Sequence, residues 1–123
     1  MGEASRLAPV ALVVEDNALV RETVAMLLEE DQMGVIQCSS AEEAQRVLER
    51  IGACVSMIFT DVNLSGFIDG VELAHFAHHR FPNIHVVVTS GLALPRSLPE
   101  GATFMPKPWV PRDVLREAER AKH

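Results

Sequence analysis

A chain of 123 residues is long enough for one domain with a single sizeable hydrophobic core. Its 48% hydrophobic and 23% charged residues are ordinary for a globular protein, and no apolar stretch approaches the roughly 20 residues of a membrane-spanning helix. The net charge of −6 and the lack of a basic run argue against a nucleic-acid-binding surface. Because the N-terminal MGEASRLAP lacks the apolar core of a signal peptide, we expect a cytoplasmic protein without a membrane partner.

The first part of the chain predicts a buried strand followed by a helix. The run VALVV (10–14) is continuous and β-branched, as is typical of a strand covered on both faces. Asn17 can cap a helix behind it, in which apolar residues recur at helical spacing from Val20 to Leu28. A second, shorter strand is predicted at VIQCS (35–39).

The same alternation continues through the middle of the chain. Ser40 and Glu43 fit an S-x-x-E capping box at the start of a second helix, and Gly52 is expected to end that helix. VSMIFT (55–60) predicts the third strand, and VELAHFAHHR (71–80) predicts a third helix after Asp-Gly. Strand–helix alternation of this kind is typical of a parallel sheet.

The C-terminal part is predicted to complete a five-stranded sheet. HVVVT (85–89) and the short TFMP (103–106) are the fourth and fifth strands, and RDVLREAERA (112–121) is the last helix. Two prolines and two glycines in SGLALPRSLPEGA (90–102) leave little room for a helix between these strands. We therefore predict a single α/β domain over residues 1–123, with its core at about 10–121 and helices on both faces of a parallel sheet.

Charged and polar residues lie at the ends of four of these strands. The first strand is followed by Glu15 and Asp16, the third by Asp61, the fourth ends in Thr89, and Lys107 follows the fifth. In an open parallel sheet the carboxyl ends of the strands form the ligand-binding edge, where the strand order reverses. If the order is 2-1-3-4-5, the three acidic side chains lie close together.

Carboxylates held this close repel one another, and a divalent cation relieves the repulsion. Oxygen ligands suit Mg²⁺, which combines carboxylates with water and phosphate oxygens. Lys107 adds a compact positive charge, and Thr89 adds a hydroxyl donor. A carboxylate nucleophile surrounded by these groups is suited to phosphoryl transfer, in which charge stabilisation supplies most of the catalysis.

These motifs resemble those of one known family. VVEDN, FTDVNLSG followed by DG, VVVTSG and FMPKPW occur in the order and at the separations found in the receiver domain of two-component response regulators, and the resemblance runs from about residue 10 to 121. It implies a doubly wound, flavodoxin-like five-stranded sheet of order 2-1-3-4-5. It also implies a phosphoacceptor that switches contacts with other proteins and is not a turnover enzyme.

The resemblance assigns a role to individual residues. Asp61 would accept a phosphoryl group from a histidine kinase or a histidine phosphotransfer protein, with Thr89 and Lys107 contacting the phosphoryl oxygens. Glu15, Asp16 and Asp61 would hold Mg²⁺, Asp16 directly and Glu15 directly or through water, with the backbone carbonyl of Asn63 as a further ligand. The downstream protein partner is not identified by these motifs.

Two further features follow from the resemblance. Phe104 occupies the position of an aromatic switch residue, although a simple core phenylalanine is the alternative. Lys107–Pro108 is expected to be a cis peptide bond, which before proline costs only about 0.5–1 kcal/mol.

The sequence departs from the family pattern between the fourth and fifth strands. Lys107 lies 18 positions after Thr89, fewer than a receiver with a full fourth helix needs, so we expect that helix to be shortened or absent. Ser65 replaces a proline that is common in the loop after the acceptor, which leaves the loop less restrained. Trp109 stands where the family often has phenylalanine, with packing or partner contact as its two possible roles.

Other functions and settings stay open at this stage. A phosphatase of the haloacid dehalogenase type shares the strand-end aspartate but needs a second aspartate two residues later, where this chain has Asn63. A receiver-like binding module without phosphorylation is a further alternative. The domain could act alone or as the receiver of a hybrid histidine kinase.

Overall fold

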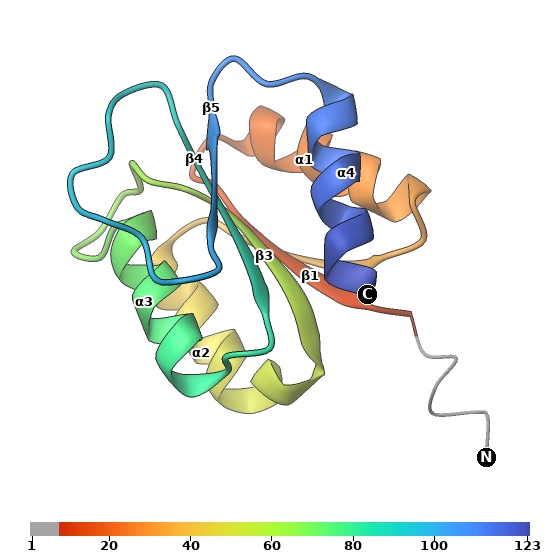
Figure 1. The fold of residues 1–123 in the computed structure, drawn as a ribbon, viewed down its shortest axis with the longest axis horizontal. Helices are drawn as coiled ribbons and strands as arrows, with labels where there is room; N and C mark the ends of the chain where they lie inside the picture. The colour runs from red at the N-terminus through yellow and green to blue at the C-terminus, as the bar shows by residue number, and fades with distance from the viewer. Residues whose placement is uncertain (1–7) are drawn as a thin grey trace.

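The computed structural model describes residues 8–123 and contains one five-stranded sheet (Figure 1). The strands are β1 (Val10–Val14), β2 (Gly34–Cys38), β3 (Val55–Asp61), β4 (His85–Ser90) and β5 (Thr103–Pro106). The helices are α1 (Ala18–Glu30), α2 (Ala41–Ile51), α3 (Gly70–Arg80) and α4 (Pro111–Lys122), with a 3₁₀ turn, η2 (Gly52–Cys54), after α2. The order is β2-β1-β3-β4-β5 and all neighbouring strands are parallel, which confirms the predicted doubly wound fold.

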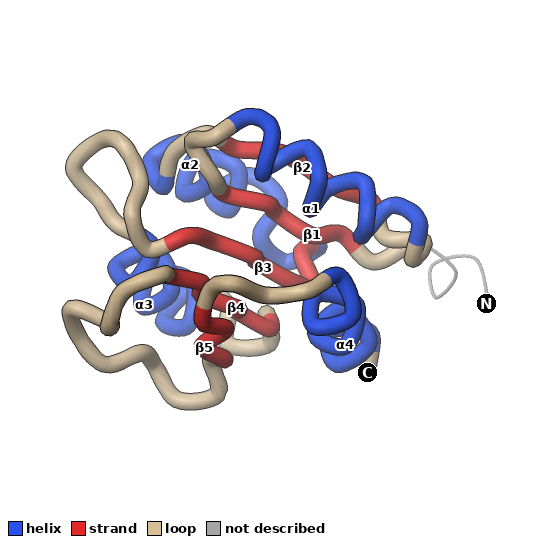
Figure 2. Tube along the Cα trace, turned by 90° about the horizontal axis from the view of Figure 1, so that it is seen from above, coloured by secondary structure: helices blue, strands red, loops and turns tan. Residues whose placement is uncertain are grey.

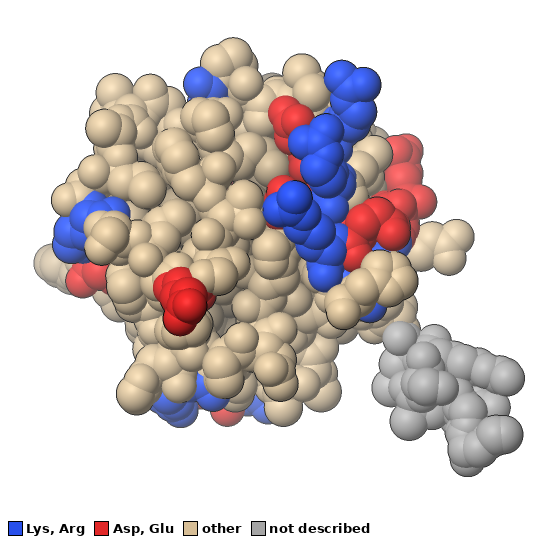
Figure 3. All heavy atoms as spheres, in the orientation of Figure 1, with Lys and Arg blue, Asp and Glu red and all other residues tan. Residues whose placement is uncertain are grey.

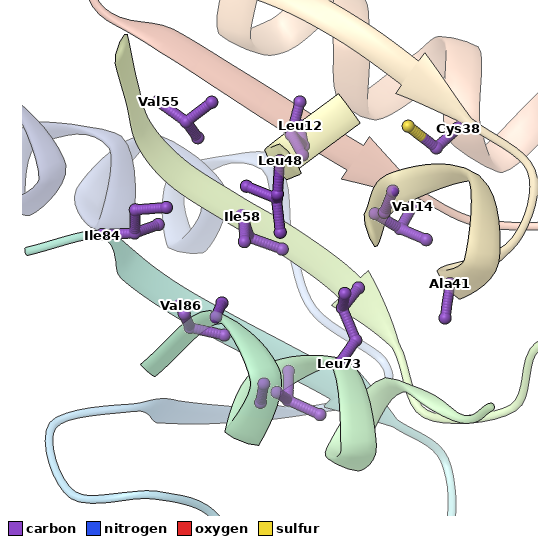
Figure 4. Packing of buried hydrophobic residues seen from close by; sticks show 14 of the residues in the cluster. Leu12, Val14, Cys38, Ala41, Leu48, Val55, Ile58, Leu73, Ile84 and Val86 are labelled. Carbon is purple, nitrogen blue, oxygen red and sulfur yellow. The ribbon is translucent and has the colours of Figure 1, made fainter. Parts of the chain in front are cut away.

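Helices cover both faces of the sheet (Figure 2). On one face, α2 and α3 pack on alternate strand residues such as Leu12 and Ile58 (Figure 4). On the other face, α1 and α4 pack on the intervening residues, such as Val13 and Phe59. Because successive strand side chains point to opposite faces, a strand buried on both sides must be apolar throughout. This is why β1 and β3 are continuous hydrophobic runs.

Local predictions for β2 and α2 need correction. The strand begins at Gly34 and ends at Cys38, one residue earlier than predicted. Ser40 Oγ accepts from the Glu43 amide at 3.1 Å as expected, but Glu43 Oε1 accepts from the Ser39 amide at 2.7 Å instead of closing the box on Ser40. The helix ends at Ile51 with Gly52 as its C-cap, as predicted, but Gly52 has an ordinary right-handed φ of −53°. Glycine is needed here because an added Cβ would lie 2.4 Å from the Phe81 ring.

The connection between β4 and β5 contains no helix within its described residues 91–102, as the sequence predicted. It is attached to α3 instead. Arg96 Nη2 donates to both carboxylate oxygens of Asp69 at 2.7 and 2.6 Å, and His75 Nε2 lies 2.9 Å from the Ser97 carbonyl oxygen. Leu94 and Leu98 pack against the core on the α2–α3 face. The extended segment therefore closes the part of the sheet face that a helix would otherwise cover.

Charged side chains gather over α4 on the face shown in Figure 3, where basic and acidic groups lie side by side. Arg120 Nη1 lies 3.4 Å from Glu117 Oε2, and Lys122 Nζ lies 3.3 Å from Glu119 Oε2, both pairs being one helical turn apart. The second oxygen of buried Glu117 lies 2.7 Å from His85 Nε2 on β4. Many of the basic groups on this helix are therefore engaged by acidic neighbours.

Of the described helices, none combines the length and hydrophobicity needed to cross a bilayer. The expectation of a cytoplasmic protein was based on the N-terminal residues 1–9. Most of these residues lie outside the described range 8–123.

Candidate functional site

Asp61, at the end of β3, is the centre of a polar cluster at the carboxyl edge of the sheet. It is only 5% exposed, and both carboxylate oxygens are engaged. Lys107 Nζ donates to Oδ2 at 2.6 Å, and the backbone amide of Asn63 donates to Oδ1 at 3.0 Å. A buried carboxylate oriented from two sides presents a fixed nucleophile.

The sheet register explains why these residues meet. Asp61 is the register partner of Thr89 on β4, and the Val62 amide donates to the Thr89 carbonyl at 3.0 Å. On the other side of β4, the Lys107 amide donates to the Ser90 carbonyl at 2.9 Å and extends the β5 pairing by one residue. The Lys107–Pro108 peptide bond is cis. Residues distant in sequence are thus fixed side by side by backbone hydrogen bonds.

Gly70 allows α3 to start directly against the acceptor strand. A Cβ at this position would lie 2.0 Å from the Asp61 carbonyl oxygen, and the Gly70 amide donates to the Val62 carbonyl at 2.9 Å. Asp69 caps the helix in a reciprocal box with Glu72. Asp69 therefore caps α3, and Gly70 allows the close backbone approach. Neither function was predicted from the sequence.

Glu15 is the second buried acid of the cluster, at 5% exposure. Burial raises its pKa from 4.5 to about 7; a hydrogen bond from the Asn17 amide at 3.0 Å opposes the rise, and the nearby Asp61 and Asp16 carboxyl groups add to it. Arg21 Nη1 donates to the Glu15 carbonyl oxygen at 2.8 Å and so fixes the backbone of the loop. Burial and the neighbouring carboxyl groups thus disfavour the charged form of Glu15.

The structure brings Glu15 and Asp61 together in the buried part of the cluster, whereas Asp16 is exposed at its border. Within residues 8–123, no three His, Cys, Asp or Glu side chains are grouped as a ready metal site. Mg²⁺ usually takes one or two carboxylates and keeps several waters, so it does not need such a group. The oxygen-only donors, with Glu15 and Asp61 buried side by side, fit a divalent cation at this edge.

Thr89 carries an unusual buried hydroxyl. The residue is 1% exposed, and Oγ1 has no hydrogen-bond partner among the described residues. An unpaired buried hydroxyl costs about 1–3 kcal/mol. Its position beside Asp61 leaves this hydroxyl available to a group bound at the carboxyl edge.

We expect Thr89→Val to stabilise the protein by about 1 kcal/mol, because the substitution removes the unpaired hydroxyl and keeps the side-chain shape. Urea unfolding followed by circular dichroism measures the change. Thr60→Val is the matched control: Thr60 is equally buried, but its Oγ1 donates to the Asp61 carbonyl at 2.9 Å. That control should lose about 1 kcal/mol. A loss of stability in Thr89→Val would contradict the interpretation of Thr89.

Phe104 on β5 points outward and is 37% exposed. The alternative of a simple core phenylalanine is therefore wrong. Its neighbour Met105 takes the inward position at 6% exposure, as the alternation of a strand requires. Phe104 lines a shallow hollow between β5 and α4 together with Arg116.

An apolar groove of about 430 Å³ lies beside Lys107. It is lined by Leu19, Val20 and Thr23 of α1 and by Lys107, Pro108 and Trp109. Leu19 is 76% exposed. Trp109 packs edge-on against Phe59, with ring centroids 5.8 Å apart, and also lines the groove. Core packing and contact with a partner protein are thus both compatible with the position of Trp109.

One contact near the site carried no sequence signal. Glu42, in the first turn of α2, accepts hydrogen bonds from the Phe67 and Ile68 amides of the loop between β3 and α3. The partners are 25 and 26 positions apart, and a glutamate in a first helical turn is ordinarily explained by the helix dipole. Sequence reasoning therefore missed it.

The fold and the site together define a class: a doubly wound α/β domain with an aspartate, a lysine and an acidic pair at the carboxyl edge of its sheet. The response regulator receiver domain model matches residues 11–117, and the chain belongs to this family. Receiver domains act in two-component signalling, generally bind Mg²⁺ in an acidic pocket and are generally not turnover enzymes.

Individual relatives agree with this assignment. The chain is 28% identical over 111 residues to the CAI-1 autoinducer sensor kinase/phosphatase CqsS of Vibrio cholerae, a match that covers 85% of this chain but only 16% of that protein. The receiver domain of the hybrid histidine kinase CckA superposes with a TM-score of 0.80 at 27% identity, covering 93% of this chain and 99% of that one. A receiver protein of Sinorhizobium medicae has the same fold, with a TM-score of 0.84 at 23% identity and 94% coverage of each chain.

Proposed function

We propose that this domain accepts a phosphoryl group on Asp61 from the phosphohistidine of a histidine kinase or a histidine phosphotransfer protein. The observation that carries the proposal is the buried Asp61 carboxylate bound by Lys107 Nζ at 2.6 Å, with the unpaired Thr89 hydroxyl on the adjacent strand. Phosphoryl transfer needs a positioned nucleophile and compensation of charge, and these groups supply both.

In the proposed reaction, one Asp61 oxygen attacks phosphorus in line with the phosphorus–nitrogen bond of the donor. That bond breaks, its electron pair returns to the imidazole nitrogen, and an acyl phosphate remains on Asp61. The Lys107 ammonium leaves the carboxylate to pair with a phosphoryl oxygen, and the Thr89 hydroxyl gains the acceptor that it lacks in the unmodified protein. The Asn63 amide keeps the carboxyl group oriented throughout.

The residues that would hold Mg²⁺ are Glu15, Asp16 and Asp61 through their carboxylates and Asn63 through its backbone carbonyl. When bound, the cation neutralises charge on the carboxylate and phosphoryl oxygens. The buried position of Glu15 beside Asp61 supports this assignment, and exposed Asp16 can approach from the border of the cluster.

Mg²⁺ binding is expected to strengthen as the pH rises. The pKa of Glu15 is raised to about 7, so below this pH the cation must displace a proton from Glu15. The dissociation constant for Mg²⁺ should fall by up to about tenfold per pH unit between about pH 5 and 7, and level off above. Titration followed by the fluorescence of Trp109, the single tryptophan, measures it. Glu15→Gln should bind Mg²⁺ more weakly and lose this slope, and a wild-type affinity independent of pH would contradict the role of Glu15.

The apolar groove beside Lys107 supports docking of the donor protein. A phosphohistidine that reaches Asp61 brings its own helix or loop over this edge, and exposed Leu19 with Pro108 and Trp109 offers that partner an apolar contact. Phosphorylation would then be read by a downstream protein. Movement of Thr89 toward the phosphoryl group and a change of Phe104 between β5 and α4 would alter the surface that the downstream protein contacts.

The test is incubation with acetyl phosphate and Mg²⁺, followed by intact mass measurement. We expect a gain of one phosphoryl group, which disappears when Mg²⁺ is chelated. Protein that stays unmodified while Mg²⁺ is shown to be bound would contradict the proposal and favour a binding module. Repeated turnover of a phosphate ester would instead favour a phosphatase.

A further inference from the structure

The loop of residues 62–69, which joins the acceptor strand β3 to α3, has few hydrogen bonds of its own. Its first amide, Val62, donates to the Thr89 carbonyl and continues the sheet pairing. Among residues 63–68 of the described structure, only three backbone amides have a hydrogen-bond acceptor. Asn63 donates to Asp61, whereas Phe67 and Ile68 donate to Glu42. The middle of the loop therefore depends on a side chain from α2.

Glu42 is fitted closely to this loop. Its Oε2 accepts from the Phe67 amide at 2.8 Å and from the Ile68 amide at 3.2 Å. The loop reaches this position by a left-handed turn at Gly66, with φ of +102°, and a Cβ on Gly66 would lie 2.7 Å from Glu42 Oε1. A side chain at Gly66 would therefore be strained in this turn and would displace the Glu42 carboxylate.

The interaction involves an ionised group. The hydrogen bond from the Phe67 amide is the main cause that lowers the pKa of Glu42, so the carboxylate is charged at neutral pH. Hydrogen bonds from amides to a charged carboxylate are stronger than those between neutral groups. The other carboxylate oxygen, Oε1, is buried without a partner among the described residues. The two amide hydrogen bonds to Oε2 offset the cost of leaving Oε1 unpaired.

We infer that Glu42 is a positioning residue for the acceptor site: it holds the 62–69 loop so that the Asn63 amide orients Asp61 and the Asn63 carbonyl faces the cation. This inference rests on the proposed function for the role of the cation. Ser65 stands where a proline would stiffen the loop, and Glu42 supplies the restraint from outside. At the far end of the loop, the Arg96–Asp69 pair fixes the entry to α3.

Glu42→Ala tests the inference, and Glu43→Ala is the matched control. Both remove a glutamate from the first turn of α2, but Glu43 accepts from Ser39 and does not reach the loop. In metal-free protein, hydrogen exchange at the Phe67 and Ile68 amides should speed up in Glu42→Ala only. The dissociation constant for Mg²⁺, followed by Trp109 fluorescence, should rise at least about tenfold in Glu42→Ala and stay near wild type in Glu43→Ala.

Two further variants keep the test decisive. Glu42→Gln retains an acceptor oxygen and should recover most of the exchange protection and the Mg²⁺ affinity. Gly66→Ala should act like Glu42→Ala, and it replaces that variant if Glu42→Ala does not fold. Equal effects of Glu42→Ala and Glu43→Ala on both readouts would overturn the inference. If the wild-type protein binds Mg²⁺ but is not phosphorylated, the proposed function fails, while amide exchange and Mg²⁺ affinity still decide the role of Glu42.

Discussion

Asp61→Asn is expected to abolish phosphoryl incorporation from acetyl phosphate at saturating Mg²⁺. The amide has the shape of the carboxylate but is not a nucleophile, and it no longer forms an ion pair with Lys107, whose Nζ lies 2.6 Å from Asp61 Oδ2. The fold should persist because Lys107 is 36% exposed and can turn to solvent. Intact mass measurement shows the loss directly.

Asp31→Asn is the control for Asp61→Asn. Asp31 also pairs with a lysine, Lys122, at 2.8 Å, but this pair joins the ends of α1 and α4 away from the carboxyl edge. This variant should gain one phosphoryl group as the wild type does. If Asp61→Asn still gained the group, the acceptor would be a different residue and the proposed mechanism would be wrong.

Gly70→Ala is expected to be the most destabilising of the substitutions considered, costing about 3 kcal/mol or more. The new methyl group would lie 2.0 Å from the Asp61 carbonyl oxygen and 3.0 Å from the Val62 Cα. Both neighbours are backbone atoms of the buried acceptor segment, so no side-chain rotation relieves the contact. Because α3 must move away from β3, Mg²⁺-dependent phosphorylation should be lost as well.

Gly91→Ala is the control for Gly70→Ala. Gly91 begins the helix-free connection after β4, and an added Cβ there meets no atom within 4 Å. Its free energy of unfolding, measured in urea, should stay within about 0.5 kcal/mol of wild type. Equal stability of the Gly70 and Gly91 variants would show that the close approach of α3 to Asp61 is not needed for folding.

Much of the fold could be predicted because its strands are buried on both faces. A run such as VALVV has to be apolar throughout and ends where the chain reaches the sheet edge, so the strand ends were located together with the polar residues that follow them. The missing helix was also predictable, since proline and the short spacing between Thr89 and Lys107 exclude it.

The sequence could not predict contacts between side chains and distant backbone. Arg96 meets Asp69 across 27 positions, and Glu42 meets Phe67 across 25. Gly52 follows the second helix as predicted, but its close contact with the Phe81 ring had no sequence signal. Such contacts depend on how helices and loops pack, and no local pattern of residues encodes that packing.

The candidate site was also predictable only in part. The strand-end positions predicted that Asp61, Thr89 and Lys107 would be neighbours, and the register places them side by side. Local patterns did not decide whether a side chain faces inward, so the exposed positions of Asp16 and Phe104 emerged only from the structure. Their roles in holding Mg²⁺ and in switching remain proposals.

The most direct measurement is chemical mapping of the phosphorylated residue. Protein treated with acetyl phosphate and Mg²⁺ is reduced with borohydride, which converts an aspartyl phosphate to homoserine, and is then digested and sequenced by mass spectrometry. The proposed function predicts one converted residue, Asp61. Conversion at any other aspartate, or none while Mg²⁺ is bound, would contradict it.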